Sequence, residues 1–279
     1  MSAKKNFSCL IIFLLFTSCI SKSAQAKLKG KNVNQVNKKI SGVNKINISS
    51  KTSRAEYQPT SSYDQIISHN YFTLSYSEKD EQPEWVFYKV CVQNYNKLTR
   101  RTNDYREDPL VKTSSASPKD YKGSGYDMGH LAPAHAMAQN YKAMSESFYL
   151  SNISPQKASF NRGIWRSLEN KVEFWSSFND SIYVVAGPIL DNPIDIIGKN
   201  KLSVPRAFYK TLISFKGGKA KGLAFIIPNK KSTKSIYTYV TSIDEVEQIT
   251  GIDFYHYLDT AIQERVEANL DVKKWLSMK

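Results

Sequence analysis

The sequence is poor in cysteine: its 279 residues include only three, which allow at most one internal disulfide bond. Cys9 and Cys19 lie in an N-terminal segment that we expect to be removed, which leaves Cys91 without a partner for an internal disulfide bond. Cys91 lies in the apolar run Val90-Cys91-Val92. This setting predicts a buried thiol with a packing role.

Long apolar runs and internal repeats are also missing. The run Leu10–Phe16 is too short to span a bilayer, which requires roughly 20 apolar residues. No segment recurs at a fixed period, which argues against solenoids and propellers. The content of 41% hydrophobic and 12% aromatic residues excludes a wholly disordered or fibrous chain. One large domain or two small ones fit this length.

The N-terminal residues 1–26 have the pattern of a signal peptide. Two lysines precede the apolar run, and Ala24-Gln25-Ala26 forms a small-x-small cleavage site. We therefore expect a secreted or periplasmic protein. The alternative is a lipid-anchored protein at the cell envelope, because residues 15–19 resemble a bacterial lipoprotein cleavage box. That box would leave Cys19 lipidated as a membrane tether.

The positive charge is concentrated in a short segment. The chain carries a formal charge of +14, and residues 27–55 contain eight basic residues and no acidic one. This segment is rich in Asn, Ser and Lys and has no helical or strand periodicity, so we interpret it as a flexible basic linker. Residues 1–26 carry three lysines and no acidic residue, so only +3 remains for residues 56–279, which we take as one domain. Basic charge alone therefore does not identify a nucleic-acid-binding protein.

Strand patterns lie before and after a helical middle within residues 56–279, which predicts an α+β fold. Tyr71–Tyr76 and Trp85–Val92 are aromatic and β-branched runs that we expect to pair as a hairpin. Residues 99–124 are polar and predict a long loop, which in a compact domain is usually functional. Further strands are expected at Ile182–Ala186, Phe208–Phe215 and Leu223–Ile227.

Two helices are predicted between and after these strands. Trp165, Leu168, Val172 and Trp175 follow one another at spacings of three and four, which places them on one buried stripe. Later in the chain, Ser242 begins a capping box and the helix runs to about Ile249, with Gly251 as its stop.

The first candidate for chemistry is His130, in the element Asp127-Met128-Gly129-His130 on an expected strand beside the long loop. A histidine at such a place can take a proton from a water molecule near neutral pH. The element is weak evidence on its own, because a lone histidine more often has a structural role.

The second candidate is the pair Asn161 and Glu169 at the start of the predicted helix. Glu169 follows Asn161 by eight residues, or about 80° round a helix, so both side chains face one site. Mg²⁺ takes oxygen ligands and keeps most of its waters, so an amide carbonyl supported by a carboxylate is chemically sufficient. The alternative is that Asn161 only caps the helix.

At these residues the sequence resembles the DNA/RNA non-specific endonuclease family, the ββα-metal nucleases with endonuclease G-like members. The resemblance covers roughly residues 70–260 in separate blocks that keep their order. They are the Trp85 strand, Arg101-Thr102, Asp108-Pro109, the His130 element, residues 152–156, residues 161–169, residues 204–210, residues 224–229 and residues 247–254.

The resemblance implies a central antiparallel sheet with helices packed on it, and a role for each matching residue. His130 would be the general base, Asn161 the direct Mg²⁺ ligand, and Glu169 would hold the hydrated metal. Arg101 would contact the phosphate, and Asn152 would position either the histidine or the phosphate. The ion would be Mg²⁺, with Mn²⁺ as an alternative.

Two departures from the family pattern remove positive charge. The family usually has an arginine within Asp-Arg-Gly-His, where this sequence has Met128. Some members have a basic residue one turn after the metal-proximal glutamate, where this sequence has Glu173. Losing one charge-stabilising donor can lower a rate by roughly 10²–10³. Arg162 and Arg166 lie one helical turn apart nearby and are the expected substitutes in substrate binding.

Two functions follow. The leading hypothesis is an exported Mg²⁺-dependent endonuclease that hydrolyses phosphodiester bonds in DNA and RNA without sequence preference. The alternative is a nucleic-acid-binding envelope protein with a degenerate nuclease fold, in which Met128 and Glu173 have abolished turnover.

Overall fold

A computed structural model describes residues 57–60, 64–95, 98–217, 219–268, 270 and 272–277. These residues belong to a compact unit, Asn47–Lys279. The predicted signal segment, Cys19 and the basic linker lie outside the described residues. Among the described residues, no helix has the length and apolar character needed to cross a membrane.

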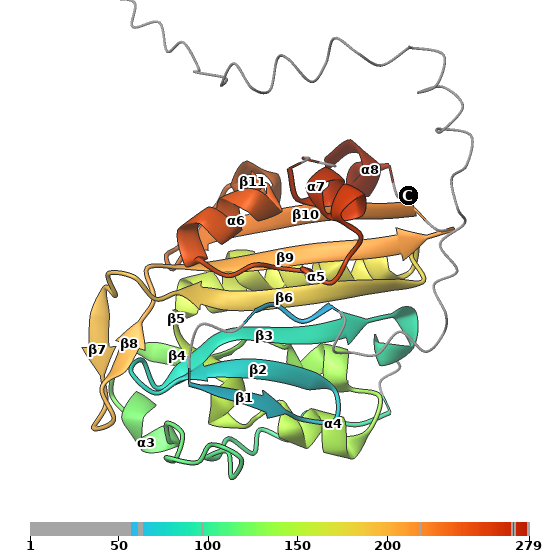
Figure 1. The fold of residues 1–279 in the computed structure, drawn as a ribbon. Helices are drawn as coiled ribbons and strands as arrows, with labels where there is room; N and C mark the ends of the chain where they lie inside the picture. Colours follow the sequence, from blue (N-terminus) through green and yellow to red (C-terminus); the bar gives the residue numbers. More distant parts are fainter. Residues whose placement is uncertain are drawn as a thin grey trace, which may run out of the picture. The chain divides into compact units, whose positions relative to one another are not determined.

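An antiparallel sheet of seven strands forms the centre of the fold (Figure 1), in the order β1-β2-β3-β6-β9-β10-β11. Its strands are β1 Gln65–Ser68, β2 Phe72–Ser77, β3 Gln82–Val90, β6 Ser181–Ile189, β9 Ala207–Lys216, β10 Lys219–Pro228 and β11 Val240–Thr241. Two further antiparallel pairs lie outside this sheet. They are β4 Tyr126–His130 with β5 Ile153–Lys157, and β7 Asp195–Ile197 with β8 Leu202–Val204.

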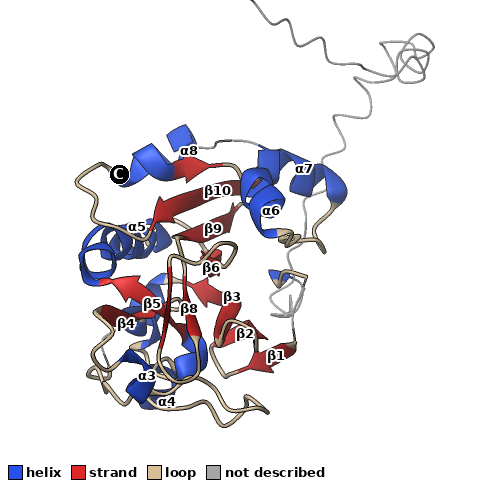
Figure 2. Ribbon diagram, turned by 90° about the vertical axis from the view of Figure 1, so that its left-hand side faces the viewer, coloured by secondary structure: helices blue, strands red, loops and turns tan. Residues whose placement is uncertain are grey.

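Helices cover both faces of the central sheet. Figure 2 shows α5 (Arg166–Ser176) on one face and α6 (Ile243–Thr250) with α7 (Thr260–Ala268) on the other. The described helices also include α3 Pro118–Tyr121, α4 Tyr141–Glu146 and α8 Val272–Leu276, with short 3₁₀ turns at Val92–Tyr95, Ala134–Met137, Leu150–Asn152 and Ile236–Tyr239. Because both faces are covered, successive residues of the inner strands are buried in two separate cores.

The two predicted helices are confirmed. Trp165, Leu168, Val172 and Trp175 are at most 2% exposed, because this stripe packs on the sheet. The side chain of Ser242 accepts a hydrogen bond from the backbone N–H of Glu245 at 3.1 Å, which caps α6. Gly251 ends α6 with a φ of 71°, in the left-handed region that favours glycine.

The predicted strands are present, and some details differ. β2 and β3 pair antiparallel as the expected hairpin, but β3 ends at Val90, before Cys91. Cys91 is therefore only half-buried, and its Sγ donates to Oδ1 of Asn94 at 2.8 Å. The predicted loop over residues 99–124 contains the short helix α3, which begins at a proline.

An acidic cluster joins α6 to α7 on the sheet face opposite α5. Carboxylate oxygens of Asp244, Glu247 and Glu267 lie within 4.8 Å of one another. Glu267 is only 5% exposed, and burial raises its pKa to about 8. Burial likewise raises the pKa of Glu247 to about 7, although its carboxylate accepts the backbone N–H of Phe254 at 2.7 Å. The folded state therefore favours protonated forms of both groups.

This cluster predicts a loss of stability with rising pH. Because the folded pKa values of Glu247 and Glu267 exceed the ordinary value of 4.5, their contribution is complete below that pH and is lost through about pH 8. We expect the free energy of unfolding in urea to fall by about 1–3 kcal/mol between pH 5 and pH 8.5. Glu267→Gln should flatten this slope, and the exposed Glu264→Gln on the same helix should leave it unchanged. Equal slopes in all three proteins would contradict the assignment.

Candidate functional site

The β4–β5 ribbon carries His130 at the end of β4. In its register His130 pairs with Ile153, Gly129 with Ser154, and Asp127 with Gln156. A Cβ atom on Gly129 would lie 2.2 Å from Cδ of Gln156, so only glycine leaves room for the buried glutamine side chain. The backbone oxygen of His130 accepts the indole N–H of Trp165 at 3.3 Å, which ties the end of this strand to α5.

Asn161 lies in a π turn, Phe160–Trp165, that precedes α5. Gly163 breaks the helical geometry of this turn, with φ −106° and ψ −110°. The angle of 80° expected from a regular helix therefore does not describe the arrangement of Asn161 and Glu169. Asn161 is not a helix cap either, because Ser159 is the N-cap of the π turn and Trp165 is the N-cap of α5. Its Nδ2 donates to Oδ2 of Asp127 at 2.9 Å.

Asp127 also binds Arg162 through two hydrogen bonds. Nε of Arg162 donates to Oδ2 at 2.8 Å and Nη2 donates to Oδ1 at 2.7 Å. This fork geometry fixes the guanidinium beside the strand. The side chain of Arg162 is 73% exposed, so it remains accessible to a ligand. One carboxylate thus orients both the amide of Asn161 and the charge of Arg162.

A cleft of about 750 Å³ brings the predicted residues together. Its polar lining contains His130, Asn161, Glu169, Arg101, Arg162 and Arg166, together with Tyr95, Tyr105, His135 and Glu173. Its apolar lining contains Met128, Pro133, Ala134, Ala138 and Met144. The histidine, the amide and the carboxylate therefore face one space although they come from different elements.

His130 is held as a neutral imidazole. Burial lowers its pKa well below 6.5, and the charge of Arg101 and the neighbouring His135 lower it further. Two aromatic rings lie against it in T-shaped arrangements, since the ring centroids of Phe148 and Tyr105 lie 4.7 Å and 5.7 Å from that of His130. Among the described residues, its Nε2 has no hydrogen-bond partner. A buried neutral imidazole with an unpaired nitrogen is able to accept a proton.

Arg101 lies in the long loop and is positioned by three contacts. Its Nε donates to Oδ1 of Asn103 at 2.7 Å, and its Nη2 donates to the hydroxyl of Tyr105 at 3.3 Å. The guanidinium also lies 4.7 Å from the ring centroid of Phe148. The Tyr105 hydroxyl in turn donates to the backbone oxygen of Met128 at 3.2 Å, which joins the loop to β4.

Glu169 is a partly buried carboxylate in the first turn of α5. Burial raises its pKa to about 7, and the positive charges of Lys210, Arg101 and Arg166 act in the opposite direction. Burial therefore favours the uncharged form, and the nearby positive charges favour the carboxylate. A cation in the cleft would favour the carboxylate.

Asn152 lies outside the cleft and is fully buried. Its Oδ1 accepts the N–H of Ala132 at 2.9 Å, and its Nδ2 donates to the backbone oxygens of Ala132 and Ser147 at 2.9 Å. These bonds fix the backbone that directly follows His130. The geometry therefore favours positioning of the histidine over contact with a phosphate.

Glu173 faces His135 across the cleft at 4.0 Å, between Oε2 and Nε2. His135 also lies against the ring of Tyr95, with centroids 5.6 Å apart. Position 173, where the resemblance led us to expect a basic residue in some family members, thus belongs to an acid–histidine pair. Sequence reasoning missed His135 and Tyr105, because neither belongs to a recognisable motif.

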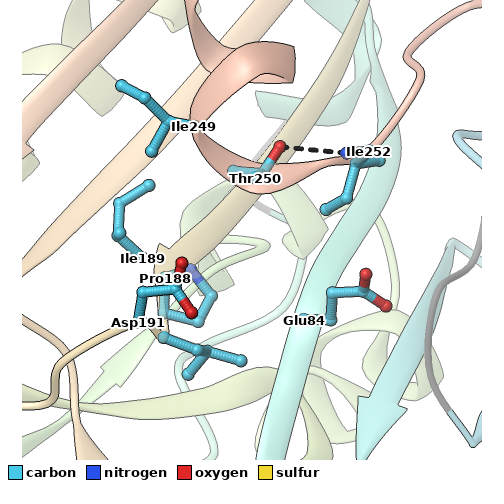
Figure 3. Close-up of a pocket in the computed structure, with 8 residues that line it drawn as sticks. Glu84, Pro188, Ile189, Asp191, Ile249, Thr250 and Ile252 are labelled. Atoms are coloured by element: carbon cyan, nitrogen blue, oxygen red, sulfur yellow. Dashed lines mark hydrogen bonds between the residues drawn. The ribbon is translucent and has the colours of Figure 1, made fainter.

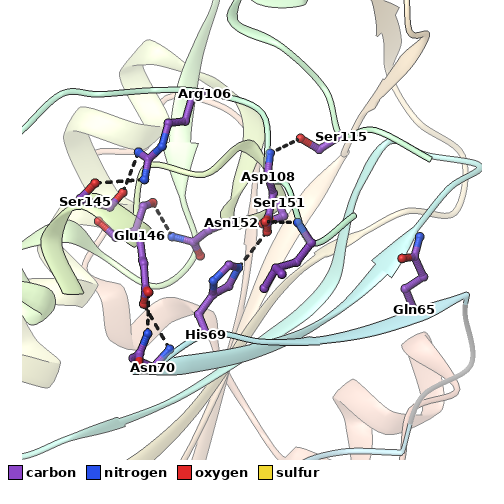
Figure 4. Close-up of polar contacts among 12 residues, drawn as sticks. Gln65, His69, Asn70, Arg106, Asp108, Ser115, Ser145, Glu146, Ser151 and Asn152 are labelled. Carbon is purple, nitrogen blue, oxygen red and sulfur yellow. Dashed lines mark hydrogen bonds and ion pairs between the residues drawn. The ribbon is translucent and has the colours of Figure 1, made fainter. Parts of the chain in front are cut away.

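A buried polar network supports the loop that carries Arg101 (Figure 4). Oδ2 of Asp108 accepts hydrogen bonds from Nε2 of His69 at 2.8 Å and from the hydroxyl of Ser151. Although burial opposes it, the hydrogen bond from His69 keeps the pKa of Asp108 below its usual value. Nearby, Arg106 donates to the backbone oxygen of Ser145 at 3.0 Å. His69 therefore has a structural role.

A second cavity is separate from this site. It has a volume of about 30 Å³ and is lined by Glu84, Asp191, Thr250 and neighbouring apolar residues. Figure 3 shows these side chains. None of the predicted site residues lines it.

Comparison with known sequences matches residues 49–261 to the family described as DNA/RNA non-specific endonuclease. The chain is 30% identical over 205 residues to human "Endonuclease G, mitochondrial", covering 68% of this chain and 69% of that protein. It is 30% identical over 213 residues to "Nuclease EXOG, mitochondrial" of Xenopus laevis, covering 70% of this chain and 58% of that protein. It is also 30% identical over 213 residues to "Nuclease C1" of Cunninghamella echinulata var. echinulata, covering 70% of this chain and 84% of that protein.

The fold is similar to a solved structure as well. A chain of the "Crystal structure of the EndoG/EndoGI complex: Mechanism of EndoG inhibition" superposes with a TM-score of 0.69 and 28% sequence identity, covering 76% of this chain and 95% of that chain. The predicted α+β, ββα-metal nuclease fold is thereby confirmed.

The environment of His130 gives a prediction that a titration checks. We expect its ring to remain neutral to well below pH 6.5 in the metal-free protein, because burial and Arg101 both disfavour the charged form. Arg101→Gln should raise the pKa of His130 only in part, since burial is the larger cause. NMR of the His Cε1–H signals between pH 4 and pH 8, assigned with His130→Gln, measures the pKa of His130 in the wild-type protein and in Arg101→Gln. A wild-type midpoint above 6.5 would contradict this assignment.

Proposed function

Because the chain belongs to the DNA/RNA non-specific endonuclease family, we propose that it is a Mg²⁺-dependent endonuclease that hydrolyses phosphodiester bonds in DNA and RNA. The observation that carries the proposal is the convergence of His130, Asn161 and Glu169 on one cleft. Family members are metal-dependent nucleases, and the identity of the ion and the residue roles below are the proposed part.

The donor set of the cleft suits a hard divalent cation. Asn161 offers an amide oxygen and Glu169 a carboxylate, and Mg²⁺ prefers oxygen ligands. Among the described residues, no hydrogen bond involves Oδ1 of Asn161, while Asp127 fixes the amide through its Nδ2. Asn161 would be the direct ligand and Glu169 would hold the hydrated ion, with Mn²⁺ as an alternative. The ion, when bound, supplies positive charge that stabilises the developing phosphorane and the leaving oxygen.

His130 is the proposed general base. Its neutral imidazole takes a proton from the attacking water through Nε2, the nitrogen that is unpaired among the described residues. The rings of Phe148 and Tyr105 keep the imidazole in place, and Asn152 fixes the backbone after it. The proton then occupies an imidazolium, which the negative charge of a bound phosphate favours.

Arginine side chains are the proposed phosphate ligands. Arg101, Arg162 and Arg166 line the same cleft, and a guanidinium matches the geometry of a phosphate. Arg162 is the substitute for the arginine absent at Met128, because Asp127 holds its guanidinium beside β4. Binding through the phosphate backbone carries no sequence information, which agrees with cleavage without sequence preference.

Export belongs to the same proposal. Residues 1–26 have the features of a signal peptide, so the enzyme would act in the periplasm or outside the cell, or at the envelope if Cys19 is lipidated.

The principal test is cleavage of circular DNA and of RNA with Mg²⁺. We expect the wild-type protein to degrade both, EDTA to stop it, and His130→Ala and Asn161→Ala each to lower the rate by roughly 10³ or more, because each removes a group that acts on the transition state. His256→Ala, outside the cleft, is the control and should keep full activity. Tight binding without cleavage in Mg²⁺ or Mn²⁺ would instead favour a degenerate nuclease fold.

The proposal that Arg162 supplies the charge of the arginine absent at position 128 has its own test. Arg162→Ala should lower kcat/KM by about 10²-fold, because it removes a charge-stabilising donor from the cleft. In a Met128→Arg background, the same substitution should cost less than about 10-fold, since the arginine at position 128 supplies the charge. Steady-state kinetics on one DNA substrate compares the four proteins. An equal loss in both backgrounds would show that Arg162 has another role.

A further inference from the structure

Residues 196–243 form a strongly basic block within a domain that is otherwise net acidic. They contain ten lysine and arginine residues and no aspartate or glutamate, whereas residues 56–279 as a whole carry only +3. The block includes β9 and β10 and the loop that follows β10, in which three of the ten basic residues lie. Positive charge that gathers on one part of a folded surface attracts a polyanion.

The buried side chain of Asn229, at the end of β10, brings part of this block to the β4–β5 ribbon. Asn229 is only 3% exposed, and its Oδ1 accepts the backbone N–H of Lys157 at 2.8 Å. Its Nδ2 donates to the backbone oxygens of Pro155 at 3.2 Å and Pro205 at 3.0 Å. The backbone N–H of Asn229 donates to the oxygen of Arg206 at 2.9 Å. One asparagine therefore holds three segments side by side.

Each of these three segments carries basic side chains at the surface. Lys157 ends β5, Arg206 directly precedes β9, and Lys230 and Lys231 follow Asn229. Lys157 is half-buried, and the other three are exposed. We call Lys157, Arg206, Lys230 and Lys231 the basic strip.

The basic strip adjoins the arginine side of the cleft. Lys157 pairs with Tyr126 in the register of β5 and β4, and its Nζ lies 4.1 Å from the ring centroid of Tyr126. The residue after Tyr126 is Asp127, whose carboxylate binds the guanidinium of Arg162 in the cleft lining. Positive charge thus leads from Arg162 over Lys157 to the other members of the basic strip.

Among the described contacts, one carboxylate borders the basic strip. The hydroxyl of Tyr126 donates to Oδ2 of Asp195 at 3.2 Å. Asp191 holds Arg206 through its backbone oxygen, at 3.2 Å from Nε, but its side chain lines the small second cavity (Figure 3). Four cations beside one carboxylate leave this surface positive.

We propose that the basic strip binds the phosphate backbone of the nucleic acid at nucleotides beyond the cleaved bond. The inference rests on the proposed function, because it extends the substrate path of that same cleft. Double-stranded DNA carries one negative charge per about 1.7 Å of its axis, so a strand that leaves the cleft past Arg162 presents further phosphates to this surface. Lysine and arginine contacts to phosphates give affinity without reading sequence.

Binding in EDTA tests the proposal without turnover. Lys157→Gln/Lys230→Gln removes two of the proposed phosphate contacts. For a duplex of about 30 base pairs, measured by fluorescence anisotropy between about 50 and 300 mM KCl, the slope of log K against log[KCl] should become shallower by about 2, and Kd at about 100 mM KCl should rise about 5-fold or more. Lys157→Arg/Lys230→Arg should bind as the wild type does. An unchanged slope and Kd would overturn the proposal, and so would a loss of binding to phosphatidylserine vesicles with unchanged binding to DNA.

Lys216→Gln/Lys219→Gln is the matched control, because it removes the same charge from exposed positions on the same two strands. These lysines pair at one end of β9 and β10, each ten residues long, and the basic strip lies at the other end, about 30 Å away (Figure 1). Since that distance exceeds the screening length, the control should change the slope by less than about 0.5. An equal change in both double variants would show only an effect of net charge and would overturn the proposal.

Cleavage of a long and a short substrate gives a second readout. With the duplex of about 30 base pairs, Lys157→Gln/Lys230→Gln should raise KM about 5-fold and change kcat less than about 2-fold, because the basic strip does not contact the cleaved bond. With a dinucleotide, which reaches only the cleft, both constants should change less than about 2-fold. Equal losses with both substrates would overturn the proposal. If the wild type cleaves neither substrate, the proposed function is wrong, and the binding measurement decides the inference by itself.

Discussion

The carboxylate of Asp127 joins the two segments on which the site depends. It accepts hydrogen bonds from Asn161 and Arg162, which lie 34 and 35 residues later in the chain. Only 17% of its side chain is exposed, so these charge-assisted bonds are stronger than they would be in water. Because Asp127 is three residues before His130 on β4, the same interaction sets the distance between the histidine and the π turn. The apolar stripe of α5 then fixes the rest of the helix on the sheet.

Sequence patterns predicted the parts of the fold in which a single requirement dominates. The stripe from Trp165 to Trp175 follows from the burial of apolar side chains on one helix face. The helix after Ser242 follows from the need to pair backbone N–H groups at its start. Both helices are present. β5 was not predicted, because its sequence, residues 153–157, contains a proline and no apolar alternation. It forms through pairing with β4, which is a tertiary effect. Cys91 is half-buried where a buried thiol was predicted, because β3 ends one residue before it.

The residues of the site were predictable from the resemblance, but their geometry was not. Motif order indicated His130, Asn161 and Glu169, and all three line one cleft. A regular helix from Asn161 to Glu169 was the wrong assumption, because Gly163 interrupts the turn. The pairing of Arg162 with Asp127 was not predictable from the sequence either. Spacing alone does not show which arginine binds a carboxylate on another element.

Several departures from ordinary folding rules surround the cleft, and they support its assignment independently of any resemblance. A buried imidazole nitrogen is unpaired among the described residues, a helix begins after a broken π turn, and the fully buried Lys210 lies against Trp165 in the core beneath. Each lowers stability, and natural sequences keep such features mainly where function requires them. The acidic cluster between α6 and α7 is costly as well, so strain alone does not identify an active site. What distinguishes the cleft is that its costly groups combine a base, oxygen donors and guanidinium groups around one space.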